Sequence, residues 1–523
     1  MQVLNFVHLL FSMNLLSPKG ILRLVMAIRK HGINIMVLLQ LSGRVYGSKI
    51  ALTDDYESIS YNQLLIQCEN LAMNLRHDYD VGENKKVAFL CRNHISFVKA
   101  IFSVSRLGSE LYLLNTEMSL GQFNELAALH QFDLLICDGE VMDLVENSTF
   151  TNKRIICFHD KIDSIHQLTQ KRYDLAYKLK RASTSKIILL TGGTTGKPKK
   201  VVHQPSLMNY VNPFLTLLTK LKLLSKENML IATPIYHGYG IAILLSFIGL
   251  GKTVFLNRRF SAEAACDLIR IHEIEAVTVV PLMIDKMIKH NVNDLKSLTC
   301  IASGGAYLNP KLVVEVNDKL GDVLFNLYGT SESGLNCIAG PADLNTNSHT
   351  IGKAITGVQL KILDKNGNKV EAGQVGQFFI KTSWSMKNNR DAWIATGDLG
   401  YKGSRGLFYL SGRTDDMIVS AGENVYPIQL EQILIHHHLI KDVAVIGIED
   451  ELFGQRLCAF VEPLNEELTS QDVLDWLASR AARYQLPKKV ILMNTIPYTS
   501  IGKQDKKNLE AEAKECRTGG GTG

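Results

Sequence analysis

The chain has 523 residues, of which 46% are hydrophobic and 21% are charged, and its formal net charge is +6. This length exceeds what one hydrophobic core usually organises, so we expect several domains. The composition is that of a folded globular protein and excludes a disordered chain. Because the charge is small for the length and no basic tract alternates with aromatic residues, we expect no nucleic-acid partner.

Nine cysteines are scattered along the chain, and none forms a C-x-x-C pair. That spacing offers neither a zinc-finger ligand set nor a dithiol redox motif. The cysteines are therefore interpreted as reduced core thiols, which is typical of a cytoplasmic protein.

The amino terminus is apolar and basic. Residues 1–16 are mostly apolar, and no acidic residue precedes Asp54. The pattern lacks the charge order and cleavage site of a secretory signal, and no apolar run reaches the ~20 residues of a spanning helix. Two interpretations remain: residues 1–45 make peripheral contact with an anionic membrane surface, at the inner face of the membrane, or they form a helical lid on the main body.

Apolar strand patterns over 86–91, 133–137 and 154–158 alternate with helical patterns, which indicates a parallel sheet covered on both faces. Apolar strand patterns alternate with helical patterns again after residue 200, with strand patterns at 253–256, 276–280 and 323–325. We therefore expect two layered α/β subdomains before residue 340.

Glycine-rich short segments over 350–412 predict a small antiparallel sheet, and a compact α+β unit follows, with strands at 443–447 and 458–461 and a helix near 471–480. The predicted fold class is α/β, with a large amino-terminal domain and a small mobile carboxy-terminal domain. The expected domains are an extension over 1–50, a large domain over 51–412, a small lid domain over 413–510 and a flexible tail over 511–523.

The stretch TGGTTGKPKK at 191–200 follows an apolar strand. Backbone amides of a glycine turn approach phosphate oxygens closely, and hydroxyls and lysines add hydrogen bonds and charge. A P-loop is excluded, because its spacing requires glycine at Thr191 and a hydroxyl at Pro198. The alternatives at this point are another kind of phosphate loop and a plain tight turn.

Four further motifs follow in order: YGTSE at 328–332, WIATGD at 393–398, GRTDDMI at 412–418 with GENVYP at 422–427, and PYTSIGK at 497–503. Together with the glycine loop they resemble the signatures of adenylate-forming enzymes, which comprise acyl-CoA synthetases, peptide-synthetase adenylation domains and luciferases. The resemblance covers residues 50–510. It departs from the usual pattern at Gly192, Lys200 and Tyr498, and in a short segment between Lys381 and Trp393.

The resemblance implies a role for each motif. Glu332, with Thr191, is expected to hold Mg²⁺. Asp398 and Arg413 are expected to hold the ribose of ATP. Lys503 is expected to bind both the substrate carboxylate and the α-phosphate. The remaining nucleotide-binding residues are expected to be Thr191, Gly192, Gly193, Thr194, Thr195, Gly196, Lys199, Gly304, Tyr328, Gly329, Thr330, Ser331 and Gly422.

His237 is expected to line the acyl tunnel, and Asp415 to be the pivot of a domain rotation that brings residues 422–427 to the site for attack by a thiol. The structural alternatives are a core histidine at 237, a helix-start glutamate at 332, an ion pair between Asp398 and Arg413, and a surface lysine at 503.

The expected activity is therefore ATP- and Mg²⁺-dependent activation of a carboxylic acid and transfer of the acyl group to coenzyme A. A fatty acid is the leading substrate, since a basic apolar amino terminus suits lipid capture. The alternatives are an aryl-acid CoA ligase of the menaquinone-pathway type, such as an o-succinylbenzoate-CoA ligase, a stand-alone enzyme that loads a carrier protein, and an inactive binding protein. The oligomeric state stays open.

Overall fold

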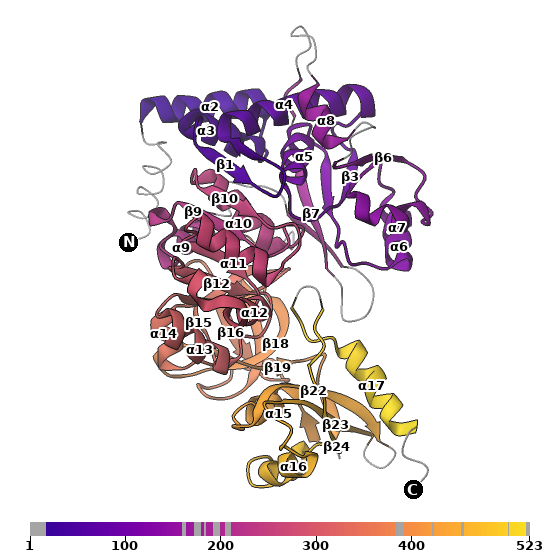
Figure 1. The fold of residues 1–523 in the computed structure, drawn as a ribbon, viewed down its shortest axis with the longest axis vertical. Coiled ribbons are helices and arrows are strands. Elements are labelled where there is room, and N and C mark those ends of the chain that lie inside the picture. The colour runs from indigo at the N-terminus through magenta and orange to yellow at the C-terminus, as the bar shows by residue number, and fades with distance from the viewer. Residues whose placement is uncertain are drawn as a thin grey trace.

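The structure, a computed structural model, describes residues 17–158, 164–171, 179–182, 185–191, 199–203, 211–382, 384, 392–420, 423–450, 454–499 and 502–518. A large amino-terminal part carries two sheets, and a smaller carboxy-terminal domain lies at the opposite end of the molecule from the first helices (Figure 1). The α/β fold with a large and a small domain is thereby confirmed.

The first sheet has the strand order β6-β5-β3-β4-β7-β8. All neighbouring strands are parallel except the last pair. Its strands are β3 (Lys86–Leu90), β4 (Glu110–Leu113), β5 (Leu134–Cys137), β6 (Lys153–Ile156), β7 (Lys186–Thr191) and β8 (Lys199–His203). The associated helices are α4 (Tyr61–Tyr79), α5 (Ile95–Arg106), α6 (Leu120–His130), α7 (Met142–Glu146) and α8 (Ile165–Gln170). The continuous apolar runs are buried, as expected for a parallel sheet with both faces covered.

The second sheet has thirteen strands, in the order β16-β17-β18-β19-β15-β14-β13-β12-β11-β9-β10-β1-β2. Its α/β part contains β1 (Ile50–Thr53), β2 (Ser58–Ser60), β9 (Asn228–Ile231), β10 (Thr253–Leu256), β11 (Ala276–Val279), β12 (Cys300–Gly304) and β13 (Leu324–Thr330). The helices of this part are α9 (Val211–Lys220), α10 (Gly238–Gly249), α11 (Ala262–Ile271), α12 (Pro281–Asn291), α13 (Pro310–Leu320) and α14 (Pro341–Thr346).

The glycine-rich region forms the predicted antiparallel strands, but they continue the second sheet. The strands are β14 (Gly334–Ala339), β15 (Thr350–Ala354), β16 (Gln359–Leu363), β17 (Gly376–Lys381), β18 (Ile394–Lys402) and β19 (Phe408–Arg413). One edge of β15 pairs with β14 and the other with β19, so the ladder passes from the α/β part into the antiparallel part without a break.

The carboxy-terminal domain has a five-stranded sheet built from β20 (Ile418–Ser420), β21 (Glu423–Val425), β22 (Ile440–Asp450), β23 (Gly454–Pro463) and β24 (Lys489–Leu492). Its helices are α15 (Pro427–Leu434), α16 (Ser470–Ala478) and α17 (Lys506–Thr518). The last helix, α17, extends to Thr518, beyond residue 511, at which the flexible tail is expected to begin. Leu509 and Ala513, four residues apart, are buried in a cluster with residues of β22 and β23, and this contact holds α17.

Two helices precede the first strand. In α3 (Met36–Tyr46), Met36 and Leu39 are fully buried in the main core. The preceding α2 (Pro18–His31) begins at a Ser17 cap and packs Ala27 against α3. It lies along the end of the molecule that is farthest from the carboxy-terminal domain (Figure 1). None of the helices in the described ranges has the length and apolar character needed to span a bilayer.

Eight of the cysteines lie in described positions, and all eight are buried. This agrees with the interpretation of reduced core thiols.

Candidate active site

The glycine loop lies at the open end of a hairpin. Strands β7 and β8 are antiparallel, and their last paired residues are Thr191 and Lys199. Gly192, Gly193, Thr194, Thr195 and Gly196 lie outside the described residues, as do the side chains of Thr191 and Lys199. Because β7 runs parallel to β4, the hairpin end is at the carboxyl edge of the first sheet, where α/β folds bind ligands.

The centre of the site is the carboxylate of Asp398, which is 7% exposed. The Tyr328 hydroxyl donates to Asp398 Oδ2 at 2.6 Å, and the Arg413 guanidinium donates to Oδ1 at 3.0 Å. Asp398 and Arg413 are direct partners in the β18–β19 ladder, and Tyr328 comes from β13. Two consecutive strands, β18 and β19, and the distant strand β13 thus converge on one carboxylate.

Burial raises the pKa of Asp398, and the Tyr328 hydrogen bond and the Arg413 charge oppose that rise. Arg413 is itself held from the other side, since its Nε donates to Asp415 Oδ1 at 2.8 Å and its second nitrogen reaches Oδ2 at 3.3 Å. The residue expected to be the pivot therefore also orients the arginine. The ion-pair interpretation of Asp398 and Arg413 is geometrically correct, and the pair stands within a larger polar cluster.

Thr330, Ser331 and Glu332 lie where β13 turns back into β14. The Thr330 hydroxyl accepts from Ser333 N at 3.1 Å, and a Cβ on Gly329 would lie 2.4 Å from the carbonyl oxygen of Gly334. The interpretation of Glu332 as a helix-start residue is wrong, because this close approach makes a hairpin turn and no helix follows. The turn presents Glu332 as a half-buried carboxylate.

On the side expected for the acyl group, His237 precedes α10. Its Nε2 is buried without a hydrogen-bond partner, and burial, with a contribution from Lys503, lowers its pKa to about 4. Tyr239 donates to the Ala302 carbonyl at 2.8 Å, and its ring lies against Gly304 at the end of β12. His237 is therefore neutral near pH 7, with one nitrogen available to a bound molecule.

Lys503 is carried by a tight turn of the carboxy-terminal domain. Thr499 N donates to the Lys503 carbonyl at 2.7 Å, and Gly502 has a φ of +73°, a region that favours glycine. A Cβ on Gly502 would lie 2.5 Å from Val280 Cγ2, so the turn is pressed against the start of α12. Figure 1 shows this turn reaching from the small domain to the large one.

Lys503 is exposed, and its charge is felt at the centre of the site. The surrounding protein removes part of its water and Arg413 repels it, which lowers its pKa, while the Asp398 carboxylate acts in the opposite direction. Lys503 also lowers the pKa of His237. The structure therefore brings together five predicted residues that are far apart in the chain, namely His237, Tyr328, Asp398, Arg413 and Lys503.

Several contacts that hold the small domain had no signal in the sequence. Lys311 Nζ donates to the carbonyls of His437 at 2.9 Å and Ile440 at 2.6 Å. Tyr498, which departs from the usual motif, donates its hydroxyl to Asp442 Oδ2 at 2.7 Å. A pair 56 residues apart carries no local pattern, so only the folded chain reveals it.

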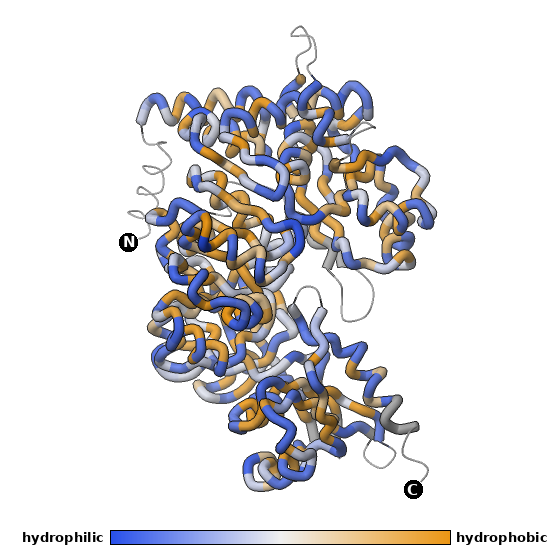
Figure 2. The backbone as a smooth tube through the Cα atoms, viewed as in Figure 1, coloured by the Kyte–Doolittle hydropathy of each residue, from blue (hydrophilic) through white to orange (hydrophobic). Residues whose placement is uncertain are grey.

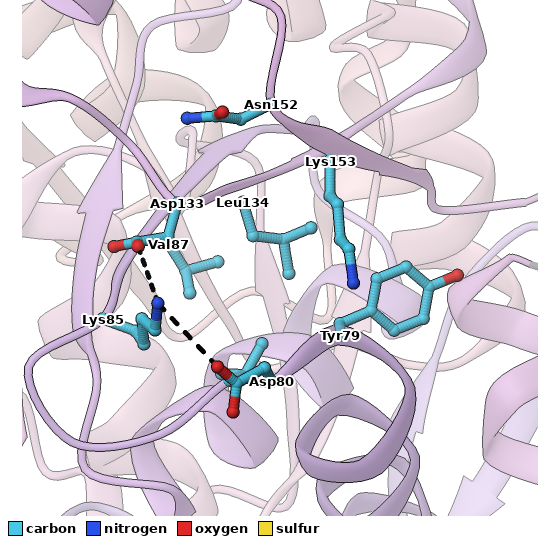
Figure 3. A pocket seen from close by; sticks show the side chains of 9 residues that line it. Tyr79, Asp80, Lys85, Val87, Asp133, Leu134, Asn152 and Lys153 are labelled. Atoms are coloured by element: carbon cyan, nitrogen blue, oxygen red, sulfur yellow. Dashed lines mark hydrogen bonds and ion pairs between the residues drawn. The ribbon is translucent and has the colours of Figure 1, made fainter.

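Gly422 lies outside the described residues. A separate cavity of about 280 Å³, lined among others by Lys85, Asp133 and Lys153, lies at the amino ends of β3, β5 and β6 (Figure 3). Lys85 joins Asp133 at 3.0 Å there. This is the sheet edge opposite the hairpin end, so the cavity is not part of the candidate site.

Comparisons with known proteins agree with this geometry. Residues 39–388 match the AMP-binding enzyme family, and residues 429–503 match the AMP-binding enzyme C-terminal domain.

Among curated proteins, the chain is 29% identical to an indoleacetate–CoA ligase of Aromatoleum aromaticum, over 88% of this chain and 94% of that one. It is 26% identical to a 2-succinylbenzoate–CoA ligase of Bacillus subtilis, over 90% of this chain and 96% of that one.

Two solved structures share the fold. The o-succinylbenzoate CoA synthetase of Bacillus subtilis, in complex with its acyl-adenylate intermediate, superposes with a TM-score of 0.77 at 24% identity, over 90% of this chain and 97% of that one. ATP-bound MatB of Rhodopseudomonas palustris superposes with a TM-score of 0.81 at 21% identity, over 92% of this chain and 99% of that one. With one family match over 350 residues and a second on the small domain, the chain belongs to the AMP-binding enzyme family.

Proposed function

We propose that the protein is an ATP-dependent acid–CoA ligase that acts on an aryl carboxylic acid. The observation that carries the adenylating part is the docking of the Lys503 turn, whose Gly502 lies against Val280 of the large domain, so that the lysine charge acts on Asp398 and His237. The similarity to named CoA ligases over nearly the whole chain supports the thioester as product.

In the adenylating step, the acid carboxylate attacks the α-phosphate of ATP and pyrophosphate leaves. The Lys503 charge acts on both the Asp398 carboxylate and His237, and a cation at this place reduces the repulsion between the two reacting anions. Asp398 accepts hydrogen bonds from the ribose while Tyr328 and Arg413 hold it in place. The hairpin end at Thr191 and Lys199 is assigned to the phosphates that depart.

Glu332 fits a Mg²⁺ role, since it is a hard carboxylate held in a turn next to β13, with its side chain only half buried. Bound Mg²⁺ would neutralise charge on the phosphates. Thr191 is the second assigned ligand.

Coenzyme A is the proposed thiol, because the segment around Gly422 resembles that of acyl-CoA and aryl-CoA ligases and because the curated relatives are named CoA ligases. The segment at 422–427 comes to the site after rotation of the small domain about Asp415. That rotation breaks the Lys311 hydrogen bonds and the Gly502–Val280 contact, which are few and local.

An aryl acid replaces the fatty acid as the leading substrate. By their names, the two curated relatives described above act on indoleacetate and 2-succinylbenzoate. A neutral imidazole with a free nitrogen, beside the small residue Gly304 and the ring of Tyr239, suits a planar substrate that carries a polar group.

The test is pyrophosphate release from the purified chain over a panel of arylacetic, aroylpropionic, benzoic, medium-chain and long-chain fatty acids, with and without coenzyme A. We expect the highest kcat/KM with an aryl acid, and thioester only when coenzyme A is present. Preference for a fatty acid would overturn the substrate class alone, and release with no acid in the panel would overturn the enzyme function.

Peripheral membrane contact is proposed for α2. Its outward face carries Ile21, Leu22, Val25 and Met26, which are 52 to 61% exposed. Lys19, Arg29 and Lys30 are exposed on the same helix, which has no acid in its first turn. The hydropathy colouring shows this mixture of apolar and polar residues along the helix (Figure 2). Apolar residues flanked by cations suit an anionic lipid surface.

The membrane proposal predicts co-sedimentation with vesicles that contain phosphatidylglycerol and little with pure phosphatidylcholine. Replacing the four apolar residues by serine should abolish binding, whereas serine at Leu129 and Ile271, which are 65% and 61% exposed on other helices, should leave it intact. Equal loss in both variants, or self-association through α2 without lipid binding, would contradict it.

A further inference from the structure

A second group of reactive side chains lies beyond the carboxyl ends of three strands of the first sheet. Cys91 follows β3, Asp138 follows β5 and Cys157 follows β6. One ligand atom from each lies within 4.8 Å of the other two, and no other such group of His, Cys, Asp or Glu occurs in the described part of the chain. All three residues are at most 2% exposed.

The position of the group in the sheet favours a ligand. From β3 the chain crosses to β4 on one side and then to β5 on the other, so the order of the strands reverses between β3 and β5. In open α/β sheets the crevice at the carboxyl ends of such a reversal is the usual ligand site. A cavity of about 130 Å³ opens there, lined by His94, Asp138 and Cys157 among others. Its volume suits an ion with water and is below the ~300 Å³ of small-molecule pockets.

We propose that Cys91, Cys157 and Asp138 bind a thiophilic divalent cation, with Zn²⁺ as the best match. Two thiolates and one carboxylate are ligands that Zn²⁺ takes in tetrahedral sites, and thiolates disfavour Mg²⁺ and Ca²⁺. The fourth position faces the cavity, where a water completes the coordination. Binding forms two metal–sulfur bonds and releases two thiol protons, so it requires no oxidant.

The separation of the sulfurs distinguishes a metal bridge from a disulfide. Cys91 Sγ and Cys157 Sγ are 3.4 Å apart, within hydrogen-bond distance, and the Cys91 thiol also donates to the Ile136 carbonyl at 3.3 Å. Two thiolates on one tetrahedral zinc lie about 3.8 Å apart, given a Zn–S length of about 2.3 Å, whereas a disulfide requires about 2.0 Å. Strand β5 lies between β3 and β6, so the strands that precede the two cysteines are not direct neighbours in the sheet.

His94 positions the carboxylate. Its Nδ1 accepts from Phe97 N at 3.1 Å, which assigns the ring proton to Nε2, and Nε2 lies 2.7 Å from Asp138 Oδ1. The other oxygen of Asp138 accepts from Arg92 N at 2.9 Å. Each oxygen keeps a lone pair for a cation. A histidine that donates to a metal-bound carboxylate is a common outer partner of metal sites.

The experiment uses the full reduced chain, freed of metal with a chelator and titrated with Zn²⁺ or Co²⁺ alone. We expect one Zn²⁺ per chain after gel filtration, and thiolate-to-metal charge-transfer absorption with Co²⁺. Cys91→Ser and Cys157→Ser should lose that absorption, whereas Cys68→Ser and Cys300→Ser, which change buried cysteines outside the group, should keep it. His94→Gln should weaken Zn²⁺ binding about 10- to 100-fold with the absorption band retained.

Near-ultraviolet circular dichroism establishes that each variant is folded, and a variant that fails is replaced by alanine at the same position. Absence of the Co²⁺ band in the wild-type chain would overturn the proposal, as would equal Zn²⁺ binding by wild type and Cys157→Ser.

Discussion

The two halves of the candidate site are built differently. On the ribose side, Tyr328, Asp398 and Arg413 come from strands of one continuous sheet and are joined by charged hydrogen bonds. On the other side, Lys503 is carried by a turn of the small domain whose Gly502 lies against Val280, and Lys311 of the large domain donates to the small domain elsewhere, at the carbonyls of His437 and Ile440.

Under the proposed function, the difference separates a permanent binding site from a removable catalytic group. A carboxylate held by two donors within one sheet stays in place when the small domain moves. A lysine held by local contacts can leave at little cost, since each such hydrogen bond contributes only about 1 kcal/mol net. Mutations in the two halves should therefore affect the two half-reactions differently.

The largest effect is expected for Lys503→Ala. Removal of a cation that acts only in the adenylation transition state should lower the rate of adenylation about 1,000-fold and leave thioester formation from a supplied acyl-adenylate near the wild-type rate. Pyrophosphate release and thioester formation measure the two steps, with Lys507→Ala, an exposed lysine of α17, as control. Equal loss in both steps would show that the lysine is not removable.

The next largest effect is expected for Asp398→Asn. The substitution keeps the shape but weakens the charged hydrogen bonds, so kcat/KM should fall about 10- to 100-fold in both half-reactions, because the ribose is held in each. Steady-state kinetics in ATP and in acyl-adenylate measure this. Asp318→Asn, on the exposed face of α13, is the control. A fall in kcat/KM for adenylation alone would contradict the proposed difference between the ribose side and the lysine side of the site.

Gly502→Ala tests the docking of the lysine turn. The new Cβ would meet Val280 and the φ of +73° would strain it, so adenylation should fall about 10-fold while the thioester step is retained. Val280→Ala in the same chain should restore part of the rate. The matched control is Gly321→Ala, which has a φ of +79° but no atom within 4 Å of the added carbon. An unchanged rate would mean that this contact does not position Lys503.

Tyr498→Phe removes the hydroxyl that donates to Asp442. Because the bond lies within the small domain and only supports the turn, we expect a fall in adenylation of about threefold and a lower melting temperature. Tyr484→Phe, at an exposed tyrosine of the same domain, should change neither. A loss as large as that of Lys503→Ala would place Tyr498 among the catalytic groups.

The smallest effect is a change in the titration of His237. Lys503→Ala should raise the His237 pKa from about 4, although it should stay below the usual 6.5 because burial is the larger cause. Imidazole NMR titration measures this shift, and no shift would mean that the turn is undocked in solution. Since the folded pKa is lowered, the histidine's contribution to stability is present above pH 6.5 and is lost as the pH falls towards 4, by up to about 3 kcal/mol. A His237→Gln variant should lack that loss.

Much of the chemistry was readable before the structure. Short motifs such as 328–332 and 497–503 carry residues whose roles depend on their immediate neighbours, and strands such as 86–90 carry continuous apolar runs that predict a buried parallel sheet. The assignment of Glu332 to a helix start failed because the backbone contact between Gly329 and Gly334, which makes the turn, is not a pattern of side chains.

The sequence by itself determined the family and the alternation of strands and helices, and it supplied the residues proposed for the active site, because each depends on local order along the chain. Only the tertiary structure decided three contacts. Arg413 donates to Asp415, Tyr498 donates to Asp442, and the sulfurs of Cys91 and Cys157 lie in contact although β5 separates their strands. These contacts depend on which strands become neighbours, and that choice is made by burial of the whole core.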